Sequence, residues 1–209
     1  MNHRELIDRL IKDGYLKTPR IISAFRKIDR VDFVPRNLKK EAYINTPLPL
    51  GHGQTISQPL TVAFMLELLQ PQSGDIILDI GSGSGWQAAL LAEIVGEKGK
   101  VYAMEIIEQL AESGRANAEK YGFVTNGRIE FLRGDGSEGL AEKALFDKII
   151  AAATSQSLPG AWMEQIKVGG RIVCPIKTSI FLLVKKEDSE FDEFEHPGFA
   201  FVPLVKNKI

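Results

Sequence analysis

Cysteine and histidine are scarce in this chain, whose 209 residues include one cysteine and three histidines. A single cysteine cannot form an internal disulfide, which excludes a disulfide-stapled scaffold. Cys174 lies in an apolar run, so we expect a small core residue there. His3, His52 and His196 are scattered without the spacing of metal ligands. We therefore expect no metal site.

An excess of one charge and long apolar runs are also missing. The formal net charge is -1, which gives no global electrostatic reason to expect nucleic-acid binding. No apolar run reaches membrane-spanning length, and Arg4, Glu5, Asp8 and Arg9 interrupt the N-terminal apolar positions, unlike a signal peptide. We expect a cytoplasmic monomer that binds neither nucleic acid nor a membrane.

The most informative stretch that is present reads IILDIGSGSGW, at residues 76–86. Its apolar start is typical of a strand covered on both faces, as in a parallel sheet. Gly81, Gly83 and Gly85 then allow a sharp turn and a close approach of the backbone to a ligand. A second predicted strand ends at Glu105, where an acid can accept both hydroxyls of an adenosine ribose. The sequence thus predicts a nucleotide site.

The glycine spacing bears on which cofactor binds. A nicotinamide site favours G-x-G-x-x-G facing a pyrophosphate, whereas this chain has G-x-G-x-G preceded by Asp79. An acid there repels a pyrophosphate but attracts an ammonium, which favours S-adenosylmethionine over NAD. The hydrolase pattern G-x-S-x-G does not fit, because position 83 is glycine. A tight turn without a ligand is the remaining alternative.

Apolar periodicity predicts helices and strands in alternation. Helices are expected first, on apolar stripes at 6–11 and 21–28 and over 58–70. The expected order is then strand 76–80, helix 87–95, strand 101–105, helix 108–121, strand 129–132, helix 137–143, strand 146–152, helix 159–166 and strand 171–176. This order is typical of a doubly wound α/β fold with a mostly parallel sheet.

The tail of the chain has a different pattern. Residues 179–186 and 199–204 are predicted strands, and the acidic stretch 187–195 between them is interpreted as a solvated turn. Two consecutive strands predict an antiparallel hairpin added to the sheet. No linker divides the chain, so we predict a single domain over 1–209, with N-terminal helices and a substrate loop (1–75), a cofactor-binding core (76–176) and C-terminal strands (177–209).

Asp135, in the sequence GDG, follows the third predicted strand of the core. Ligands of open α/β sheets bind beyond the carboxyl ends of the strands, so Asp135 is expected at the same edge as Gly81 and Glu105. It could accept the adenine amino group of a nucleotide. The alternative is an N-cap of the helix expected near Ser137.

Residues 47–59, PLPLGHGQTISQP, contain no carboxylate or cationic side chain but many neutral hydrogen-bonding groups. Prolines restrict both ends, and glycines allow sharp turns around His52. Together with ILDIGSGSGWQAA, GDGSEG, FDKIIAAA, VGGRIVCPI and the terminal FVPLVK, this block resembles the protein-L-isoaspartate O-methyltransferase family. The similarity runs from the N-terminal helices to the last predicted strand, and GHGQTISQP is its most specific motif.

The resemblance implies a seven-stranded Rossmann-like methyltransferase fold and methyl transfer from S-adenosylmethionine to the free α-carboxylate of L-isoaspartyl residues in damaged proteins. Repair then proceeds through a succinimide that forms without the enzyme. The family's catalytic serine corresponds to Ser57. Implied cofactor residues are Asp79, Gly81, Ser82, Gly83, Glu105, Asp135 and Gly136, and expected substrate contacts are Pro49, His52, Gln54, Thr55 and Val202, the last in a C-terminal segment, 201–206, that would close the groove.

Three positions depart from the family's usual pattern. Trp86 stands where tyrosine is frequent, Asn45 where an acid is common, and Thr154 where small apolar residues are usual. Of these, Asn45 bears on the substrate contacts. Cofactor binding is hardly affected by any of the three.

The expected methyl transfer does not require a Ser/His/Asp catalytic set. A carboxylate with a pKa near ~3.5 is already ionised at neutral pH, so its attack on a sulfonium methyl needs no general base. Ser57 would orient the carboxylate by donating a hydrogen bond. Its alternative role is the N-cap of the following helix, because it directly precedes Gln58-Pro59. His52 is interpreted as a loop-structuring residue and not a base.

Three other functions are compatible with parts of the sequence. A related enzyme could methylate normal aspartate in a peptide, with the same cofactor site and a different groove. A non-catalytic adenosylmethionine-binding module would be expected to lose Ser57 or the glycine turn, and both are intact. An NAD oxidoreductase is disfavoured by the glycine spacing and by Asp79.

Overall fold

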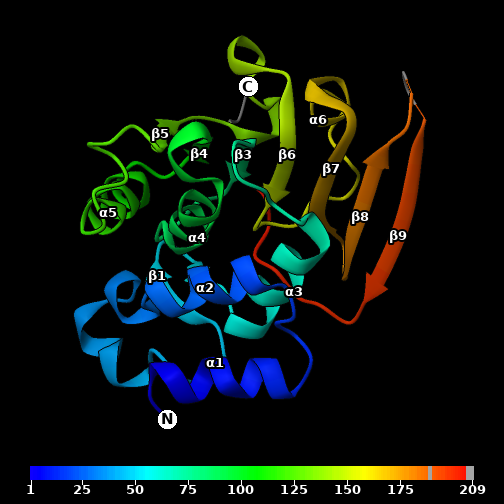
Figure 1. The fold of residues 1–209 in the computed structure, drawn as a ribbon. Coiled ribbons are helices and arrows are strands. Elements are labelled where there is room, and N and C mark those ends of the chain that lie inside the picture. The colour runs from blue at the N-terminus through cyan, green and yellow to red at the C-terminus, as the bar shows by residue number, and fades with distance from the viewer. Residues whose placement is uncertain (188–189, 206–209) are drawn as a thin grey trace.

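The structure, a computed structural model, describes residues 1–187 and 190–205. A seven-stranded sheet in the order β5-β4-β3-β6-β7-β8-β9 runs through the molecule (Figure 1). Neighbours from β5 to β7 pair in parallel, whereas β8 pairs antiparallel with both β7 and β9. The predicted fold class is confirmed. The strands are β3 (Ile76–Ile80), β4 (Lys100–Glu105), β5 (Ile129–Arg133), β6 (Phe146–Ala151), β7 (Ile166–Ile176), β8 (Ser179–Lys185) and β9 (Phe191–Pro197).

Helices cover both faces of this sheet. Successive residues of β3 alternate between two apolar clusters, since Ile77 packs with the residues of α4 and Leu78 packs with Trp162 of α6. This alternation is the period of a strand buried on both faces. The α-helices are α1 (His3–Lys12), α2 (Pro19–Lys27), α3 (Pro59–Leu69), α4 (Trp86–Val95), α5 (Glu108–Glu119) and α6 (Gly160–Gln165); short 3-10 turns are η1 (Arg30–Phe33), η2 (Arg36–Glu41), η3 (Gly96–Lys98), η4 (Gly136–Glu138) and η5 (Ala141–Lys143).

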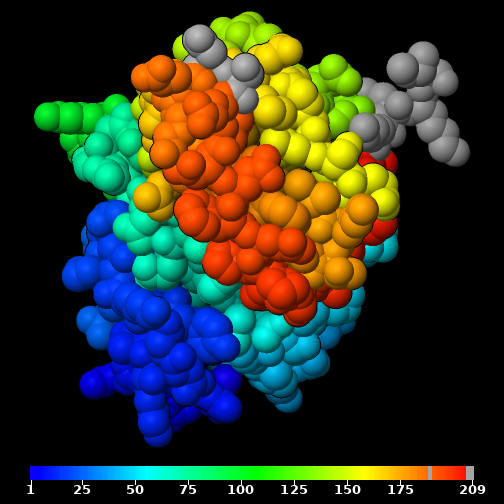
Figure 2. Space-filling model, turned by 90° about the vertical axis from the view of Figure 1, so that its right-hand side faces the viewer, coloured from blue at the N-terminus to red at the C-terminus, as the bar shows by residue number. Residues whose placement is uncertain are grey.

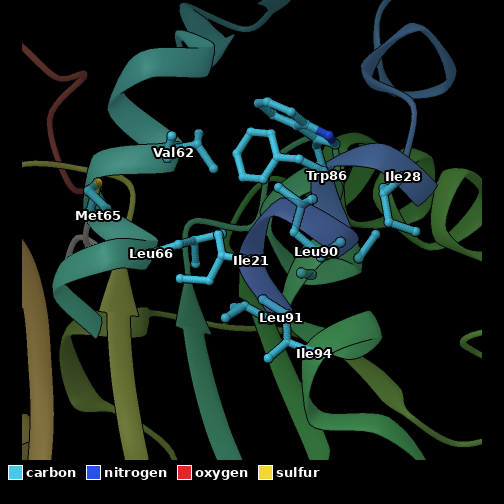
Figure 3. Close-up of a cluster of buried hydrophobic side chains, with 14 of the residues drawn as sticks. Ile21, Ile28, Val62, Met65, Leu66, Trp86, Leu90, Leu91 and Ile94 are labelled. Atoms are coloured by element: carbon cyan, nitrogen blue, oxygen red, sulfur yellow. The ribbon is translucent and has the colours of Figure 1, made fainter. Parts of the chain in front are cut away.

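The N-terminal helices are joined to the core by a continuous apolar interface. Side chains of α2, α3 and α4 point toward one another in Figure 3. The labelled residues are all at most 8% exposed: Ile21, Ile28, Val62, Met65, Leu66, Trp86, Leu90, Leu91 and Ile94. Burial of each large apolar side chain contributes about 1.5 to 3 kcal/mol. This interface fixes α3, and the chain just before it, against the loop that follows β3.

A small hairpin precedes α3 and was not predicted as strands. β1 (Leu48–Gly51) pairs antiparallel with β2 (Gln54–Ile56). His52 and Gly53 at its tip have φ of 54° and 71°, which fits the left-handed turns that match the twist of two-residue hairpins. Leu48 and Ile56 are paired and buried, so they anchor the hairpin. The expected substrate loop is therefore an ordered hairpin.

The end of the chain differs from the prediction. The acidic stretch interpreted as a turn supplies most of β9, which pairs along β8 from Phe191 to Pro197; positions 188 and 189 of that stretch lie outside the described residues. β9 is the outer strand of the sheet, and β8 and β9 form the orange-to-red surface in Figure 2. Charged side chains are typical of such edges because they oppose further strand pairing.

Residues 199–204, predicted as the last strand, instead cross over the carboxyl ends of the sheet. Thr154 N–H donates to the Val202 carbonyl over 2.8 Å, and Leu204 N–H donates to the Thr154 carbonyl over 2.8 Å. This segment makes only an isolated bridge at Pro203. Two main-chain hydrogen bonds thus hold the C-terminal segment beside the loop after β6. Lys206, the end of the expected groove segment, lies outside the described residues.

The helix predicted over 137–143 is also wrong. The chain forms the two 3-10 turns η4 and η5, separated by Gly139 with φ of 65°. Gly139 has no room for a side chain, since a Cβ there would lie 2.1 Å from Gln165 Oε1. The left-handed glycine ends η4 after one turn and prevents a continuous helix. Within the described ranges, no helix is both long and apolar enough to cross a membrane.

Candidate active site

A cavity opens at the carboxyl ends of the central strands. The loops after β3, β4, β5 and β6 line it from the sheet side, and the β2–α3 segment and the C-terminal segment (residues 199–205) line it from the other. It lies where the order of the parallel strands reverses, between β3 and β6. Ligands of doubly wound sheets bind at such a switch point.

The glycine turn after β3 is shaped by left-handed backbone. Gly81, Gly83 and Gly85 have φ of 73°, 50° and 82°, which residues with a Cβ rarely adopt. A Cβ on Gly85 would lie 2.7 Å from the Gly114 carbonyl oxygen, so Gly85 allows α5 to pack closely. Gly81 and Gly83 line the cavity together with Ser82. These three expected cofactor residues are therefore at one wall.

Glu105 ends β4 on the same wall and is buried. Its Oε2 accepts the Gly83 N–H over 2.9 Å, and its Oε1 accepts the Ile107 N–H over 3.0 Å. The carboxylate therefore fixes the glycine turn to the loop after β4. Each oxygen retains a lone pair, so the geometry allows Glu105 to accept ligand hydroxyls as predicted.

Asp79 lies inside the protein and does not line the cavity. Gln87 Nε2 donates to Asp79 Oδ1 over 2.7 Å, and Oδ2 has no hydrogen-bond partner. Burial raises the pKa of Asp79 to about 7; the Gln87 hydrogen bond opposes that shift, and the Glu105 charge adds to it. A positive charge brought near the glycine turn would offset this unfavourable negative charge. Direct contact between Asp79 and a ligand stays a prediction.

The pKa of Asp79 predicts a pH-dependent effect of Asp79→Asn on the protein without cofactor. A pKa raised from 3.8 to about 7 means that folding favours the protonated acid. Ionisation of Asp79 therefore lowers the free energy of unfolding as pH rises from about 4 to 7, by on the order of 4 kcal/mol in full. Asparagine keeps the acceptor for Gln87 and cannot ionise. Asp79→Asn should raise the thermal midpoint more at pH 8 than at pH 5.

Thermal unfolding of both proteins at the two pH values measures this difference. Asp8→Asn on exposed α1 is a matched control that should show no such pH dependence. An equal shift of the midpoint at both pH values in Asp79→Asn would contradict the assignment.

Asp135 caps η4, as the alternative interpretation proposed. Its Oδ1 accepts the Ser137 N–H over 2.9 Å. Gly134 and Gly136 on either side line the cavity. Gly136 is also required for packing, because a Cβ there would lie 2.4 Å from Ile80 Cγ2. Capping and contact with adenine are compatible, and the second stays a prediction.

Ser57 is half-buried in the cavity wall between β2 and α3. The alternative role, that Ser57 caps α3, is wrong, because the N-cap residue is Gln58 and makes no side-chain cap. Instead, Asn45 Oδ1 accepts the Leu60 N–H over 2.9 Å. Asn45, noted for its departure from the family pattern, thus supplies the side-chain acceptor for this helix end. The Ser57 hydroxyl is not used as a cap.

The residues expected to contact substrate separate into two groups. Gln54, Thr55 and Val202 line the cavity near Ser57. Pro49 and His52 do not line it; they are exposed on the outer part of the hairpin. The position of His52 at the tip agrees with its interpretation as a loop-structuring residue. Any contact that these two make with a peptide would be outside the cavity.

Two other residues that depart from the family pattern have clear structural partners. Trp86 lines the cavity and is 3% exposed, with its ring edge-on to Phe25 at a centroid distance of 5.6 Å. Thr154 donates its hydroxyl to the Lys177 carbonyl over 3.0 Å while its main chain holds the C-terminal segment. Thr154 therefore helps to position the part of the cavity wall that contains Val202.

Sequence reasoning missed Arg30. It is 1% exposed and reaches the main chain of Ser57. A single arginine at the end of an amphipathic helix pattern resembles any surface cation, so the sequence holds no signal for its burial.

Unsatisfied buried polar atoms test whether the cavity fits the expected cofactor. Asp79 Oδ2, Ser82 Oγ and Trp86 Nε1 are buried without a hydrogen-bond partner. Such atoms are costly unless a ligand or water satisfies them. Ser82 and Trp86 line the cavity, and Asp79 is a buried acid behind the glycine turn. A small ligand with polar groups and positive charge fits this set.

Comparisons with known proteins give matches along nearly the whole chain. The family model described as protein-L-isoaspartate(D-aspartate) O-methyltransferase matches residues 1–209. The protein-L-isoaspartate O-methyltransferase of Methanopyrus kandleri is 40% identical over 204 residues, which cover 96% of this chain and 89% of that protein. Protein-L-isoaspartate O-methyltransferase 2 of Archaeoglobus fulgidus is 41% identical over 204 residues, covering 96% and 92%.

Two solved structures share the fold. A protein-L-isoaspartate O-methyltransferase superposes with a TM-score of 0.88 at 28% identity, covering 99% of this chain and 67% of that chain. A Plasmodium falciparum chain, in complex with S-adenosyl-L-homocysteine, superposes with a TM-score of 0.85 at 22% identity, covering 99% and 100%. Both superpositions thus cover nearly all of this chain.

Proposed function

The chain belongs to the protein-L-isoaspartate(D-aspartate) O-methyltransferase family, and from that premise we propose how its residues perform the reaction. It is an S-adenosylmethionine-dependent enzyme that methylates L-isoaspartyl residues of damaged proteins and so begins their repair. The observation that carries the proposed mechanism is the position of Ser57, with a hydroxyl not used as a helix cap, in the cavity that the glycine turn also lines.

The cofactor is held by the wall that Gly81, Ser82, Gly83 and Glu105 form. When bound, S-adenosylmethionine supplies an electrophilic methyl group on a sulfonium. Glu105 accepts the ribose hydroxyls at the end of β4, and Asp135 together with Gly136 borders the adenine. Asp79 stabilises the positive charge of the amino-acid part through its buried carboxylate. The small residues of the turn would allow the ligand to approach the main chain closely, because Gly81 and Gly83 carry no side chain.

Ser57 orients the substrate. The α-carboxylate of an isoaspartyl residue is ionised at neutral pH and needs no base. The Ser57 hydroxyl donates a hydrogen bond to one carboxylate oxygen and holds the other in line with the methyl group. The β2–α3 segment and the C-terminal segment exclude water, which would otherwise stabilise the carboxylate charge and slow its attack. Positioning and desolvation, and not proton transfer, thus account for the rate.

Peptide recognition is proposed between the hairpin (residues 48–56) and the C-terminal segment. Gln54, Thr55 and Val202 border the opening of the cavity, and Pro49 and His52 extend this surface outward along the hairpin. Main-chain contacts would let damaged sites in many sequences bind. We propose further that the enzyme acts as a single-domain cytoplasmic monomer and that it binds neither nucleic acid nor a membrane.

Methyl transfer to matched peptides tests this selectivity. An isoaspartyl residue has an extra methylene in the main chain and a carboxylate on a shorter arm than normal aspartate. We expect kcat/KM for several isoaspartyl peptides to exceed that for their aspartyl counterparts by roughly a hundredfold or more, because a misplaced carboxylate loses its alignment. Comparable turnover of both versions would support the alternative, an enzyme that methylates normal aspartate. Cofactor binding without turnover of either version would support a non-catalytic module.

A further inference from the structure

Arg30 forms a hub of main-chain hydrogen bonds directly beside the cavity wall. Its Nη1 donates to the Ala42 carbonyl over 2.7 Å and to the Ile44 carbonyl over 3.4 Å. Its Nη2 donates to the carbonyls of Thr46 and Ser57, each over 3.1 Å. One planar fork therefore joins the loop of residues 42–46 to Ser57, the residue that follows the hairpin.

The Arg30 side chain is a buried charge held by carbonyl dipoles. No carboxylate of the described residues pairs with it, although Asp29 caps η1 and Asp32 lies within it. Burial lowers the pKa of Arg30 to about 10, so the guanidinium remains charged at neutral pH. An arginine used for stability alone is most often paired, because an unpaired buried charge is costly. In this protein the energetically unfavourable buried charge lies where the guanidinium binds the Ser57 carbonyl.

The loop held by Arg30 also contains the cap of α3. Asn45 lies between two of the carbonyls that Arg30 binds, and its side chain accepts the Leu60 N–H. The link from Ser57 to α3 is thus fixed on both sides: by Arg30 at the Ser57 carbonyl and by Asn45 at the helix end. Fixing the main chain on both sides restricts the direction of the Ser57 hydroxyl.

The guanidinium also packs on the cavity wall. Its Cζ lies 5.4 Å from the ring centroid of Trp86, over the indole face. Trp86 lines the cavity, as Ser57 does. Arg30 itself does not line it, so it has no direct route to a substrate and can act only through the residues that it holds.

We propose that Arg30 is a positioning residue for methyl transfer, which fixes the main chain at Ser57 so that the serine hydroxyl meets the substrate carboxylate. This inference rests on the orienting role proposed for Ser57. Removal of the guanidinium should therefore lower kcat, with little change in cofactor affinity, because the glycine turn and Glu105 do not contact Arg30 through any hydrogen bond described for them.

A double-mutant cycle tests the proposal. Arg30→Met, Ser57→Ala and the double variant are compared at saturating isoaspartyl peptide and S-adenosylmethionine, below the melting transition of each. Arg30→Met should lower kcat roughly tenfold, with the dissociation constant for the cofactor within about threefold of wild type. If Arg30 acts through the Ser57 hydroxyl, the double variant should be no slower than Ser57→Ala alone, since coupled residues are not additive.

A second arginine provides a matched control for general loss of stability. Arg171 Nη1 donates to the Leu68 carbonyl over 2.7 Å, at the opposite end of α3 from Ser57. Arg171→Met should lower the thermal midpoint and leave kcat unchanged. Arg30→Lys keeps the charge but not the planar fork; it should lower kcat less than Arg30→Met, and it replaces that variant in the cycle if methionine prevents folding.

The outcomes separate this inference from the role of Ser57. A normal kcat in Ser57→Ala would remove the orienting role of Ser57 and, with it, the basis for Arg30. A slow Ser57→Ala combined with a normal kcat in the Arg30 variant would overturn only the Arg30 proposal. So would a double variant in which the two losses multiply, because Arg30 would then act independently of the hydroxyl.

Discussion

Replacement of Ser57 by alanine is expected to lower kcat roughly ten- to a hundred-fold while leaving cofactor affinity nearly unchanged. A hydrogen bond to a charged group is worth about 1.5 to 3 kcal/mol, and the loss appears in kcat if the bond mainly orients the attacking oxygen. Ser57 lines the cavity from the segment between β2 and α3, whereas Glu105, the proposed partner of the ribose, lines it from the end of β4. Initial rates with an isoaspartyl peptide, together with calorimetric titration of the cofactor, measure both quantities.

The thermal midpoint of the same variant provides a second check. Asn45, and not Ser57, caps α3, because its side-chain Oδ1 accepts the Leu60 N–H. Ser57→Ala should therefore keep the wild-type midpoint, whereas Asn45→Ala should lower stability by about 1 kcal/mol. A normal kcat with a lowered midpoint in Ser57→Ala would contradict the account and direct attention to Gln54 and Thr55 as partners of the carboxylate.

Loss of Glu105 should weaken S-adenosylmethionine binding by roughly ten- to a hundred-fold. Glu105→Ala removes charge-assisted hydrogen bonds worth about 1.5 to 3 kcal/mol to the ribose. It also removes the acceptors for the N–H groups of Gly83 and Ile107, which shape the same wall. Both effects lower affinity. Isothermal titration on the folded variant measures the change.

Two further variants make the Glu105 test specific. Glu105→Gln keeps the size of the side chain and one acceptor oxygen, so it should bind more tightly than Glu105→Ala but less tightly than wild type. Glu130→Ala removes an acid of β5 that pairs with Lys100 over 3.1 Å, outside the residues that line the cavity. It should leave affinity unchanged. Unaltered affinity in folded Glu105→Ala would remove Glu105 from the cofactor site.

The central part of this fold was predictable because its sequence pattern is compatible with one local structure, a buried strand followed by a sharp turn. An apolar run followed by alternate glycines predicts a buried strand and a sharp turn, and β3 and the turn at Gly81 confirm it. The strand-end rule then placed Glu105 at the same edge, on the wall of the cavity. Local signals of this kind depend only on neighbouring residues.

The errors occurred where distant partners decide the structure. The acidic stretch forms β9 because β8 offers a free edge, and charged side chains suit that edge. Gly139 ends a helix that the apolar positions alone predicted. The short hairpin depends on the left-handed backbone of His52 and Gly53. The sequence alone does not predict this turn, because the hairpin also requires the pairing of Leu48 with Ile56.

The site was predicted in part for the same reason. The resemblance to the family identified Ser57 but could not tell an orienting hydroxyl from a helix cap, because that choice depends on Asn45, twelve positions earlier in the sequence. Arg30 left no signal, since burial of a single cation is decided by the carbonyls that the folded chain presents to it. Tertiary contacts, and not local patterns, complete the active site.

A crystal structure of the enzyme with S-adenosyl-L-homocysteine and an isoaspartyl peptide tests the central claim most directly. We expect the α-carboxylate inside the cavity, with one oxygen at a hydrogen-bond distance of about 2.6 to 3.2 Å from Ser57 Oγ. The peptide main chain should lie between the hairpin and the C-terminal segment. A carboxylate bound away from Ser57, with the hydroxyl turned toward the protein, would contradict the account.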